Sequence, residues 1–273
     1  MTPDRLAAVL GAPVTATAPV GGGCTDDALR VDLDDGRRVF VKTRADRLPG
    51  AYETEARGLR WLAAAGAIAV PRPVAVADDL LALEWIDAGE TTAAAGESLG
   101  RGLAALHRAG APGFGLDHDN FIGPLPQDNT AGDDWADFYA VRRLAPYLDD
   151  LPAEVSARLR DAIDDGRLAH VLEHDVVPSL IHGDLWSGNI VGGRWLVDPA
   201  VNRADRELDL AMLSLFGSIS DGFARGYAQV WPLDDGWQQR RPALQLYHLL
   251  VHVRLFGAGY VGGVVARLDA LGW

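Results

Sequence analysis

The chain has 273 residues, its formal net charge is -13, and 48% of its residues are hydrophobic. A chain of this length can bury a sizeable core, either as one large domain or as two smaller lobes. The acidic balance argues against nucleic acid or an anionic membrane as a partner, because both need clustered positive charge, and no apolar run approaches the roughly 18 residues of a membrane-spanning helix.

Strands dominate the predicted elements of the first third of the chain. A short amphipathic helix near residues 7–14 is followed by a glycine-rich loop at 20–25. Strands are predicted at 29–33, 39–42 and 80–86, where apolar residues alternate with polar ones or form a short continuous run.

One helix is predicted in this first third, over residues 52–65. Leu59 and Leu62 lie three residues apart and Glu55 precedes them by four and seven residues, so the three side chains share the inward face. Lys42 ends the preceding strand, and a Lys42–Glu55 pair is therefore expected. Taken alone, such a pair is usually a surface salt bridge.

The chain beyond residue 89 is predicted to be mostly helical. The spacing of apolar residues predicts helices at 91–108, 134–148, 153–172, 207–216, 223–231, 242–256 and 261–271. Residues 179–199 instead predict a strand, a loop and a hairpin whose two-residue turn is Gly192-Gly193. The pattern changes near residues 84–90, which divides the chain into a small β-rich lobe, 1–86, and a larger α-helical lobe, 91–273. The predicted fold class is α+β.

Lysine and cysteine each occur once. Of the 25 basic residues, 24 are arginine and only Lys42 is lysine. Lys42 is either a remnant of compositional drift or a site that requires a compact ammonium, which arginine replaces poorly. The single cysteine, Cys24, excludes an intrachain disulfide and favours a reducing, cytoplasmic compartment.

The densest group of chemically active residues lies at 182–189 and 198. Because a hairpin brings its two ends together, Asn189 and Asp198 should reach one small volume, and their oxygens are ligands that suit Mg²⁺. Asp184 can lie beside that metal and accept the proton of a substrate hydroxyl. His182 is interpreted as a buried histidine that supports the loop.

The remaining parts of a phosphoryl-transfer site precede this loop in the chain. Glycine in the 20–25 loop lets backbone amides approach phosphate, Lys42 can meet the phosphates, and Glu55 can hold Lys42. The connector after the third strand can offer backbone groups to an adenine edge. The expected ATP-binding residues are Gly21, Gly22, Gly23, Lys42, Glu55, Glu84, Trp85 and Ile86. Each part alone has an ordinary structural explanation, but the ordered set predicts a two-lobed, protein-kinase-like phosphotransferase that uses ATP and Mg²⁺.

Within the kinase-like phosphotransferases, which include the aminoglycoside phosphotransferases, the chain resembles the fructosamine kinase (ketosamine-3-kinase) family. The loop that follows His182-Gly183-Asp184 reads Leu185-Trp186-Ser187-Gly188-Asn189, the version typical of that family. Similar segments occur along most of the chain, at 21–24, 39–42, 70–73, 120–123, 134–139, 198–200 and 206–211.

The resemblance implies transfer of the ATP γ-phosphate to the 3-hydroxyl of a ketosamine, a sugar-modified amine that is either a small molecule or part of a glycated protein. Asp184 would be the catalytic base, Asn189 and Asp198 would hold Mg²⁺, and Trp186 would lie against the sugar. Trp135, Phe138 and Arg142 either line the same cleft or pack between helices. Asp209 is expected to anchor the catalytic loop.

Three questions stay open at this point. Cys24 is either a small residue in a tight turn or an exposed thiol that links two chains in a redox-controlled dimer, so the protein is expected to be a monomer or such a dimer. A kinase of the same fold could act on an aminoglycoside, choline or another sugar, which would favour a more acidic cleft. A nucleotide-binding pseudokinase is disfavoured, because Lys42, Asp184, Asn189 and Asp198 are all present.

Overall fold

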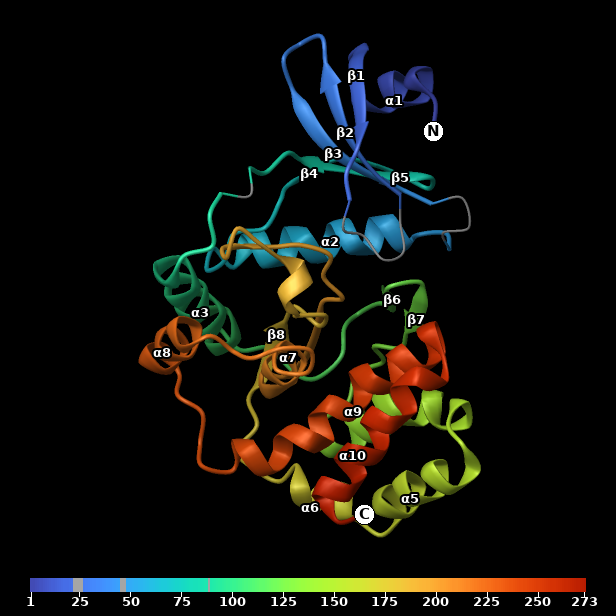
Figure 1. Ribbon diagram of the computed structural model, residues 1–273, viewed down its shortest axis with the longest axis vertical. Helices are drawn as coiled ribbons and strands as arrows, with labels where there is room; N and C mark the ends of the chain where they lie inside the picture. The colour runs from blue at the N-terminus through green and yellow to red at the C-terminus, as the bar shows by residue number, and fades with distance from the viewer. Residues whose placement is uncertain (22–26, 45–47, 88) are drawn as a thin grey trace.

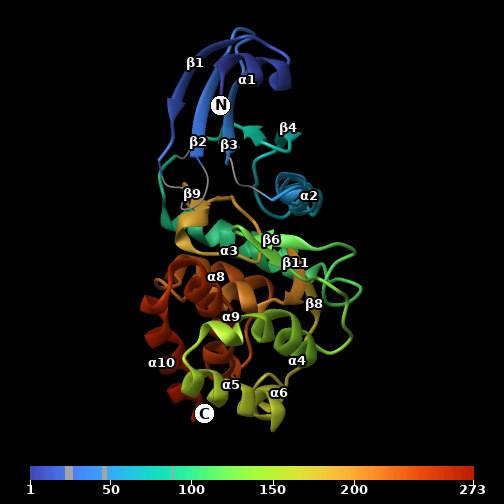
Figure 2. The ribbon, with the colours of Figure 1, turned by 90° about the vertical axis from the view of Figure 1, so that its right-hand side faces the viewer.

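The computed structural model describes residues 1–21, 27–44, 48–87 and 89–273. A five-stranded antiparallel sheet with two helices comes first along the chain, and a mainly helical region follows it (Figures 1 and 2). The predicted α+β class is therefore confirmed. None of the described helices is long and apolar enough to cross a membrane.

The sheet has the strand order β1-β2-β3-β5-β4. Its strands are β1 (Val14–Pro19), β2 (Asp27–Leu33), β3 (Arg38–Thr43), β4 (Pro73–Ala77) and β5 (Leu80–Glu84). Side chains of a strand alternate between the two faces of a sheet. In β3, Val39 and Val41 pack with Leu6 and Leu10 of α1 (Pro3–Leu10). The alternation therefore places Lys42 on the opposite face.

Helix α2 (Ala51–Ala64) covers that opposite face of the sheet (Figure 1). Leu59 and Leu62 are buried in the main core and Glu55 is buried beside them, as the helical spacing predicts. Glu53 points outward and forms an ion pair with Arg60 at 3.2 Å. Helix α2 thus presents one carboxylate to the sheet and another to solvent.

The helical region contains eight α-helices among its described residues, together with short paired strands. The helices are α3 (Ala93–Arg108), α4 (Trp135–Phe138), α5 (Ala153–Asp164), α6 (Arg167–Val171), α7 (Glu207–Leu213), α8 (Asp221–Val230), α9 (Trp237–Phe256) and α10 (Val261–Leu271). The paired strands are β6 (Asn120–Ile122) with β7 (Leu125–Gln127), β8 (Pro178–Ile181) with β11 (Asn202–Asp205), and β9 (Ile190–Val191) with β10 (Trp195–Leu196).

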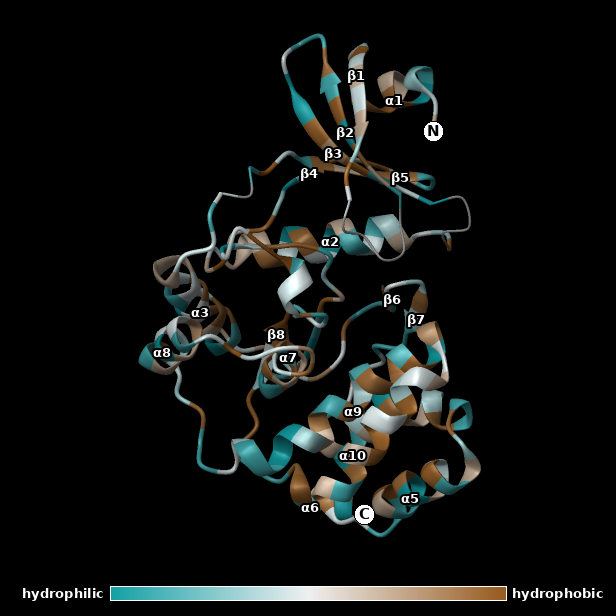
Figure 3. Ribbon diagram, viewed as in Figure 1, coloured by the Kyte–Doolittle hydropathy of each residue, from teal (hydrophilic) through white to brown (hydrophobic). Residues whose placement is uncertain are grey.

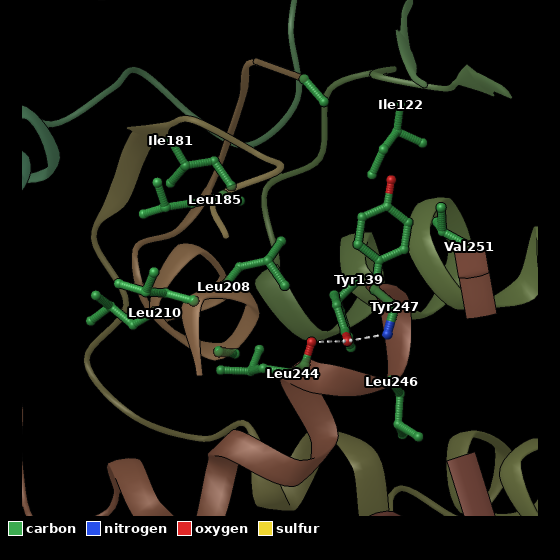
Figure 4. Packing of buried hydrophobic residues seen from close by; sticks show 14 of the residues in the cluster. Ile122, Tyr139, Ile181, Leu185, Leu208, Leu210, Leu244, Leu246, Tyr247 and Val251 are labelled. Carbon is green, nitrogen blue, oxygen red and sulfur yellow. Dashed lines mark hydrogen bonds between the residues drawn. The ribbon is translucent and has the colours of Figure 1, made fainter. Parts of the chain in front are cut away.

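The core of this region forms around α9. Figure 3 shows hydrophobic segments in the sheet and along α9, and Figure 4 shows core side chains from several elements meeting there. The buried Tyr139 hydroxyl donates to the backbone carbonyl of Leu244 at 3.0 Å and accepts from the backbone N–H of Tyr247 at 3.2 Å (Figure 4). This polar contact joins the segment after α4 to the middle of α9.

Two predicted helices are interrupted. The predicted helix at 134–148 consists of α4, a π-helical turn over Tyr139–Leu144 and a 3₁₀ helix over Ala145–Asp150, which contains Pro146. Proline has no N–H for the helical ladder, which explains the change of geometry there. The predicted helix at 153–172 breaks at Gly166, whose φ of 83° is left-handed.

Other boundaries also differ from prediction. The first helix lies at Pro3–Leu10 rather than 7–14, and the strands β1, β4, β6, β7 and β11 are not predicted at all. The β9–β10 hairpin forms as predicted, but Val191 pairs with Trp195, so its loop has three residues rather than two. Gly192 and Gly193 both adopt positive φ in this loop, which explains why both are glycine.

Candidate active site

The predicted catalytic loop, residues 182–189, runs from β8 to β9. Gly183 has a φ of 84°, and a Cβ there would lie 2.0 Å from the carbonyl oxygen of Ala200. The backbone N–H of Ala200 also donates to the carbonyl of His182 at 2.9 Å. The loop therefore packs directly on the chain segment that carries Asp198, and only glycine permits this approach.

Asp209, in the first turn of α7, binds the backbone of the catalytic loop. Its carboxylate is fully buried and accepts the backbone N–H groups of His182 and Gly183, each at 2.8 Å. His107 of α3 lies 3.2 Å away through Nε2. Burial alone would raise the pKa of Asp209, but these hydrogen bonds and the nearby imidazoles lower it. The buried carboxylate stays ionised.

His182 joins the catalytic loop to the hairpin. Its Nε2 donates to the carbonyl of Val197 at 3.0 Å, and its Nδ1 accepts the backbone N–H of Asp184 at 3.3 Å. Complete burial lowers the pKa of His182, which keeps the ring neutral in this tautomer. The contacts of His182 are those of a residue that supports the loop.

Asp184 and Asn189 meet at the open side of the loop. The Asn189 amide nitrogen donates to the backbone carbonyl of Asp184 at 2.8 Å and to its carboxylate at 3.2 Å. Burial, followed by the negative charge of Asp198, raises the pKa of Asp184 to about 7. A carboxylate with such a pKa is suited to accept a proton near neutral pH.

Lys42, Glu55 and Asp198 form an ion-pair network between the sheet, α2 and the hairpin. Lys42 Nζ lies 2.9 Å from Glu55 Oε1 and 3.0 Å from Asp198 Oδ1. The Lys42 and Glu55 side chains are only 9% and 7% exposed, whereas Asp198 is 40% exposed. Among the described residues, Asp198 is the only non-glycine with positive φ, 55°. Such a backbone costs about 1–3 kcal/mol and is often retained for function.

These groups line a cavity of about 360 Å³. Its polar lining contains the predicted site residues Lys42, Glu55, Asp184, Asn189 and Asp198, together with Trp186. The structure thus brings together six predicted residues from β3, α2, the loop after β8 and the segment after β10. The only acids among the described lining residues are Glu55, Asp184 and Asp198.

The donor set of the cavity fits a magnesium ion. The Asn189 side chain donates to Asp184 through its amide nitrogen, so its carbonyl oxygen can act as a ligand. The exposed Asp198 carboxylate and the Asp184 carboxylate supply hard oxygens close by. Burial and, after it, the negative charge of Asp198 raise the pKa of Asp184, and a bound cation would offset that charge.

Most of the other lining residues are apolar or aromatic, and several of them are not among the site residues predicted from the sequence. They include Phe121 after the start of β6, Phe216 after α7, His252 and Phe256 on α9, and Tyr260 beyond α9. His252 and Phe256 follow the lining residue His248 at intervals of four, so they continue one face of α9. This four-residue spacing within the predicted helix at 242–256 could have indicated that the three side chains share one face of the helix.

Trp186 projects from the catalytic loop at the polar part of the cavity. A Cβ on Gly188 would lie 2.3 Å from the Trp186 ring, so the indole lies directly over the backbone of Gly188. The Trp-Ser-Gly sequence therefore positions the ring by its own local geometry.

Known proteins are similar to this chain in both fold and sequence. Residues 2–271 match the family model described as fructosamine kinase. A chloroplastic protein-ribulosamine 3-kinase of Arabidopsis thaliana is 35% identical, over 94% of this chain and 82% of that protein. The crystal structure of a Thermobifida fusca protein assigned as a fructosamine-3-kinase has a TM-score of 0.90 at 39% identity, covering 99% of this chain and 98% of that one.

The chain belongs to the fructosamine kinase family. It is therefore a kinase, a phosphotransferase of a family that uses ATP, and the family and activity expected from the sequence are confirmed. A macrolide 2'-phosphotransferase of Brachybacterium faecium has a TM-score of 0.58 at 15% identity, covering 97% of this chain and 96% of that one. This second likeness shows that the two proteins share a fold.

Three residues proposed for the substrate cleft lie elsewhere in this fructosamine kinase. Trp135 and Phe138 are buried in the main core, where their rings stack on each other at 6.1 Å between centroids. Arg142 forms an ion pair with Asp128 at 2.8 Å. None of the three is among the described residues that line the cavity, which favours the packing alternative for the aromatic pair, and a place for these residues in the substrate cleft stays a prediction.

The predicted adenine-binding segment also lies apart from this cavity. Glu84 ends β5 and its carboxylate binds Arg72 at 2.8 Å, while the Trp85 indole N–H donates to Asp87 at 3.1 Å. Residues 84–86 and Gly21 are absent from the described cavity lining. Gly22, Gly23 and Cys24 lie outside the described residues, and the roles expected of all these positions stay predictions.

Proposed function

We propose that this fructosamine kinase transfers the γ-phosphoryl group of ATP to the 3-hydroxyl of a ketosamine, with Asp184 as the catalytic base. The observation that supports this most strongly is the meeting of Lys42, Glu55, Asp184, Asn189 and Asp198 around one cavity, although they come from positions as much as 156 residues apart. This set matches the division of roles in kinase-type phosphoryl transfer.

Asp184 accepts the hydroxyl proton as the nucleophile forms. Its side chain borders the cavity, and its pKa of about 7 provides a base that can take up a proton and later release it. The Asn189 amide fixes one Asp184 oxygen at 3.2 Å, which directs the other oxygen to the acceptor. The His182 and Asp209 contacts keep the backbone of this loop from moving.

Lys42, which lines the same cavity as Asp184, neutralises phosphate charge. The Glu55 carboxylate holds its ammonium in place, and the glycine-rich loop at Gly21-Gly22-Gly23 and the segment at Glu84-Trp85-Ile86 contact the phosphates and the adenine. Asn189 and Asp198 would hold Mg²⁺, which would offset the charge of the phosphates.

The proposed acceptor is the sugar part of a glycated amine, with Trp186 against the sugar. Carriage of the sugar on a protein, as in the name of the Arabidopsis relative, is part of this proposal. A polycationic aminoglycoside would favour acids around the acceptor, but the described lining contains no acid besides Glu55, Asp184 and Asp198. That composition supports the ketosamine over the aminoglycoside.

The test is ATP consumption with fructosamines, ribulosamines, free sugars and aminoglycosides as acceptors, followed by mass spectrometry of the product. The expected result is a phosphorylated ketosamine that forms only with Mg²⁺ present. Asp184→Asn should abolish turnover while nucleotide binding persists. Turnover of aminoglycosides alone would contradict the acceptor, and wild-type turnover by the variant would contradict the base.

A further inference from the structure

Four of the aromatic rings that line the cavity contact one another. His252 lies at the centre of this group, 4.7 Å from Phe216, 5.4 Å from Phe256 and 5.0 Å from Tyr260 between ring centroids. Phe216 and Phe256 are 44% and 50% exposed, which is unusual for phenylalanine. We call these four residues the aromatic wall.

The aromatic wall is continuous with the catalytic loop through one face of α9. His248 donates through Nε2 to the carbonyl of Gly183 at 2.9 Å, directly before Asp184. His252 and Phe256 follow on the next two turns, and His252 Nδ1 bonds the His248 carbonyl at 2.6 Å. Since α-helices rise 1.5 Å per residue, Phe256 stands about 12 Å along α9 from the contact with the loop.

This distance matches the length of a glycated lysine. Eight bonds join C3 of the sugar to the lysine Cα, which spans about 10 Å when extended. With the sugar 3-hydroxyl at Asp184, the four methylenes of the lysine would lie along the aromatic wall and the peptide backbone would emerge beside Phe216 and Phe256. Methylene groups gain most from such apolar surface.

The charge of the wall also suits this occupant. Burial lowers the pKa of His252, so the ring is neutral at pH 7 and no positive charge opposes the amine of the ketosamine. Aromatic faces attract a cationic amine and pack against its hydrocarbon neighbours. The wall contains no acid, so it offers apolar contact rather than ion pairing to the carrier.

We infer that the aromatic wall is the binding site for the lysine stem of glycated peptides and proteins. This inference rests on the proposed function, and it adds that the enzyme distinguishes acceptors by the carrier of the sugar. A sugar on a short amine reaches Asp184 without contacting the wall, whereas a sugar on the ε-amine of lysine contacts both.

The test compares kcat/KM for one sugar carried on methylamine and on the ε-amine of an Nα-acetyl-lysine amide. In the wild type the lysine-borne acceptor should be preferred about tenfold or more, and the double variant Phe216→Ala/Phe256→Ala should remove about tenfold of that ratio. Phe216→Leu/Phe256→Leu should keep most of the preference, because leucine retains apolar surface. Val141→Ala removes an exposed apolar side chain, 55% exposed and outside the cavity lining, and should not change the ratio.

The possible failures are distinguishable. If the wild type consumes ATP with neither acceptor, the proposed function is wrong and this inference falls with it. If both acceptors are phosphorylated but the alanine double variant leaves their ratio unchanged, the proposed function stands and the wall is not the site of the lysine stem. Far-UV circular dichroism of each variant checks that the half-exposed positions tolerate substitution.

Discussion

Replacing Asp209 by asparagine tests whether the buried carboxylate organises the catalytic loop. In the wild type, Oδ1 accepts the N–H of Gly183 at 2.8 Å, and Oδ2 accepts the N–H of His182 at 2.8 Å and faces His107 at 3.2 Å. Asparagine must turn its NH₂ group toward one of these donors. A buried hydrogen bond to a charged group contributes about 1.5–3 kcal/mol, and the stranded N–H costs a similar amount.

The expected loss of unfolding free energy for Asp209→Asn is therefore about 3–5 kcal/mol, measured by urea denaturation at pH 7. A shift of the loop by even one ångström should lower kcat by about 100-fold under conditions where the variant is folded. Asp221→Asn is the matched control. It removes an exposed carboxylate from the first turn of α8 and should cost no more than about 1 kcal/mol.

The pH dependence of stability provides a second check on Asp209. Because its pKa is lower in the folded state, the carboxylate stabilises the protein above its unfolded pKa, and this contribution disappears as the pH falls through the folded pKa. The stability gap between wild type and Asp209→Asn should therefore narrow below about pH 4. A gap under 1 kcal/mol at pH 7 together with unchanged kcat would refute the role assigned to this residue.

Three further predictions concern single residues. Lys42→Arg should lower kcat by about 100-fold or more in the ATP-consumption assay, because the planar guanidinium cannot replace the compact ammonium. Near-normal turnover would indicate that the single lysine reflects compositional drift and not a functional requirement. Gly188→Ala should push the Trp186 ring aside and raise the KM for the ketosamine but not for ATP; an equal rise in both would contradict a substrate role for Trp186. Burial would lower the pKa of His174, but its hydrogen bond to Asp205 at 2.7 Å raises the pKa in the folded protein. The free energy of unfolding should therefore fall as the pH rises above about 6.5. His174→Gln should reduce this pH dependence, as measured by urea denaturation at several pH values.

Local patterns predicted the parts of this fold that depend on neighbouring residues. Period-two alternation located β2, a short apolar run after a turn located β3, and helical spacing placed Glu55 on the buried face of α2. The strands β4 and β11 escaped prediction because their pairing is decided by tertiary neighbours, β5 and β8. Propensity alone does not report such contacts.

In the candidate site, too, residues that are close in sequence could be predicted, whereas contacts between distant residues could not. The loop at 182–189 was identified from its residues because its roles lie close together in sequence. The ion pair between Lys42 and Asp198 joins residues 156 apart, so only the folded chain brings them together. The three-residue spacing of Trp135 and Phe138 is compatible with a cleft lining or with helix packing, and only the tertiary contacts show that both rings are buried in the main core.

The geometry around Lys42 explains why a chain with 24 arginines has one lysine. Where a planar fork fits, arginine is used: Arg240 binds both oxygens of the buried Glu207 at 2.7 and 2.8 Å. Lys42 instead lies between single oxygens of two carboxylates on different elements, Glu55 at 2.9 Å and Asp198 at 3.0 Å. A compact ammonium satisfies two such partners at once, whereas a guanidinium would have to move one of them. Composition alone left it open whether the single lysine reflects compositional drift or a functional requirement. The contrast between the contacts of Arg240 and those of Lys42 favours a functional requirement for lysine at position 42.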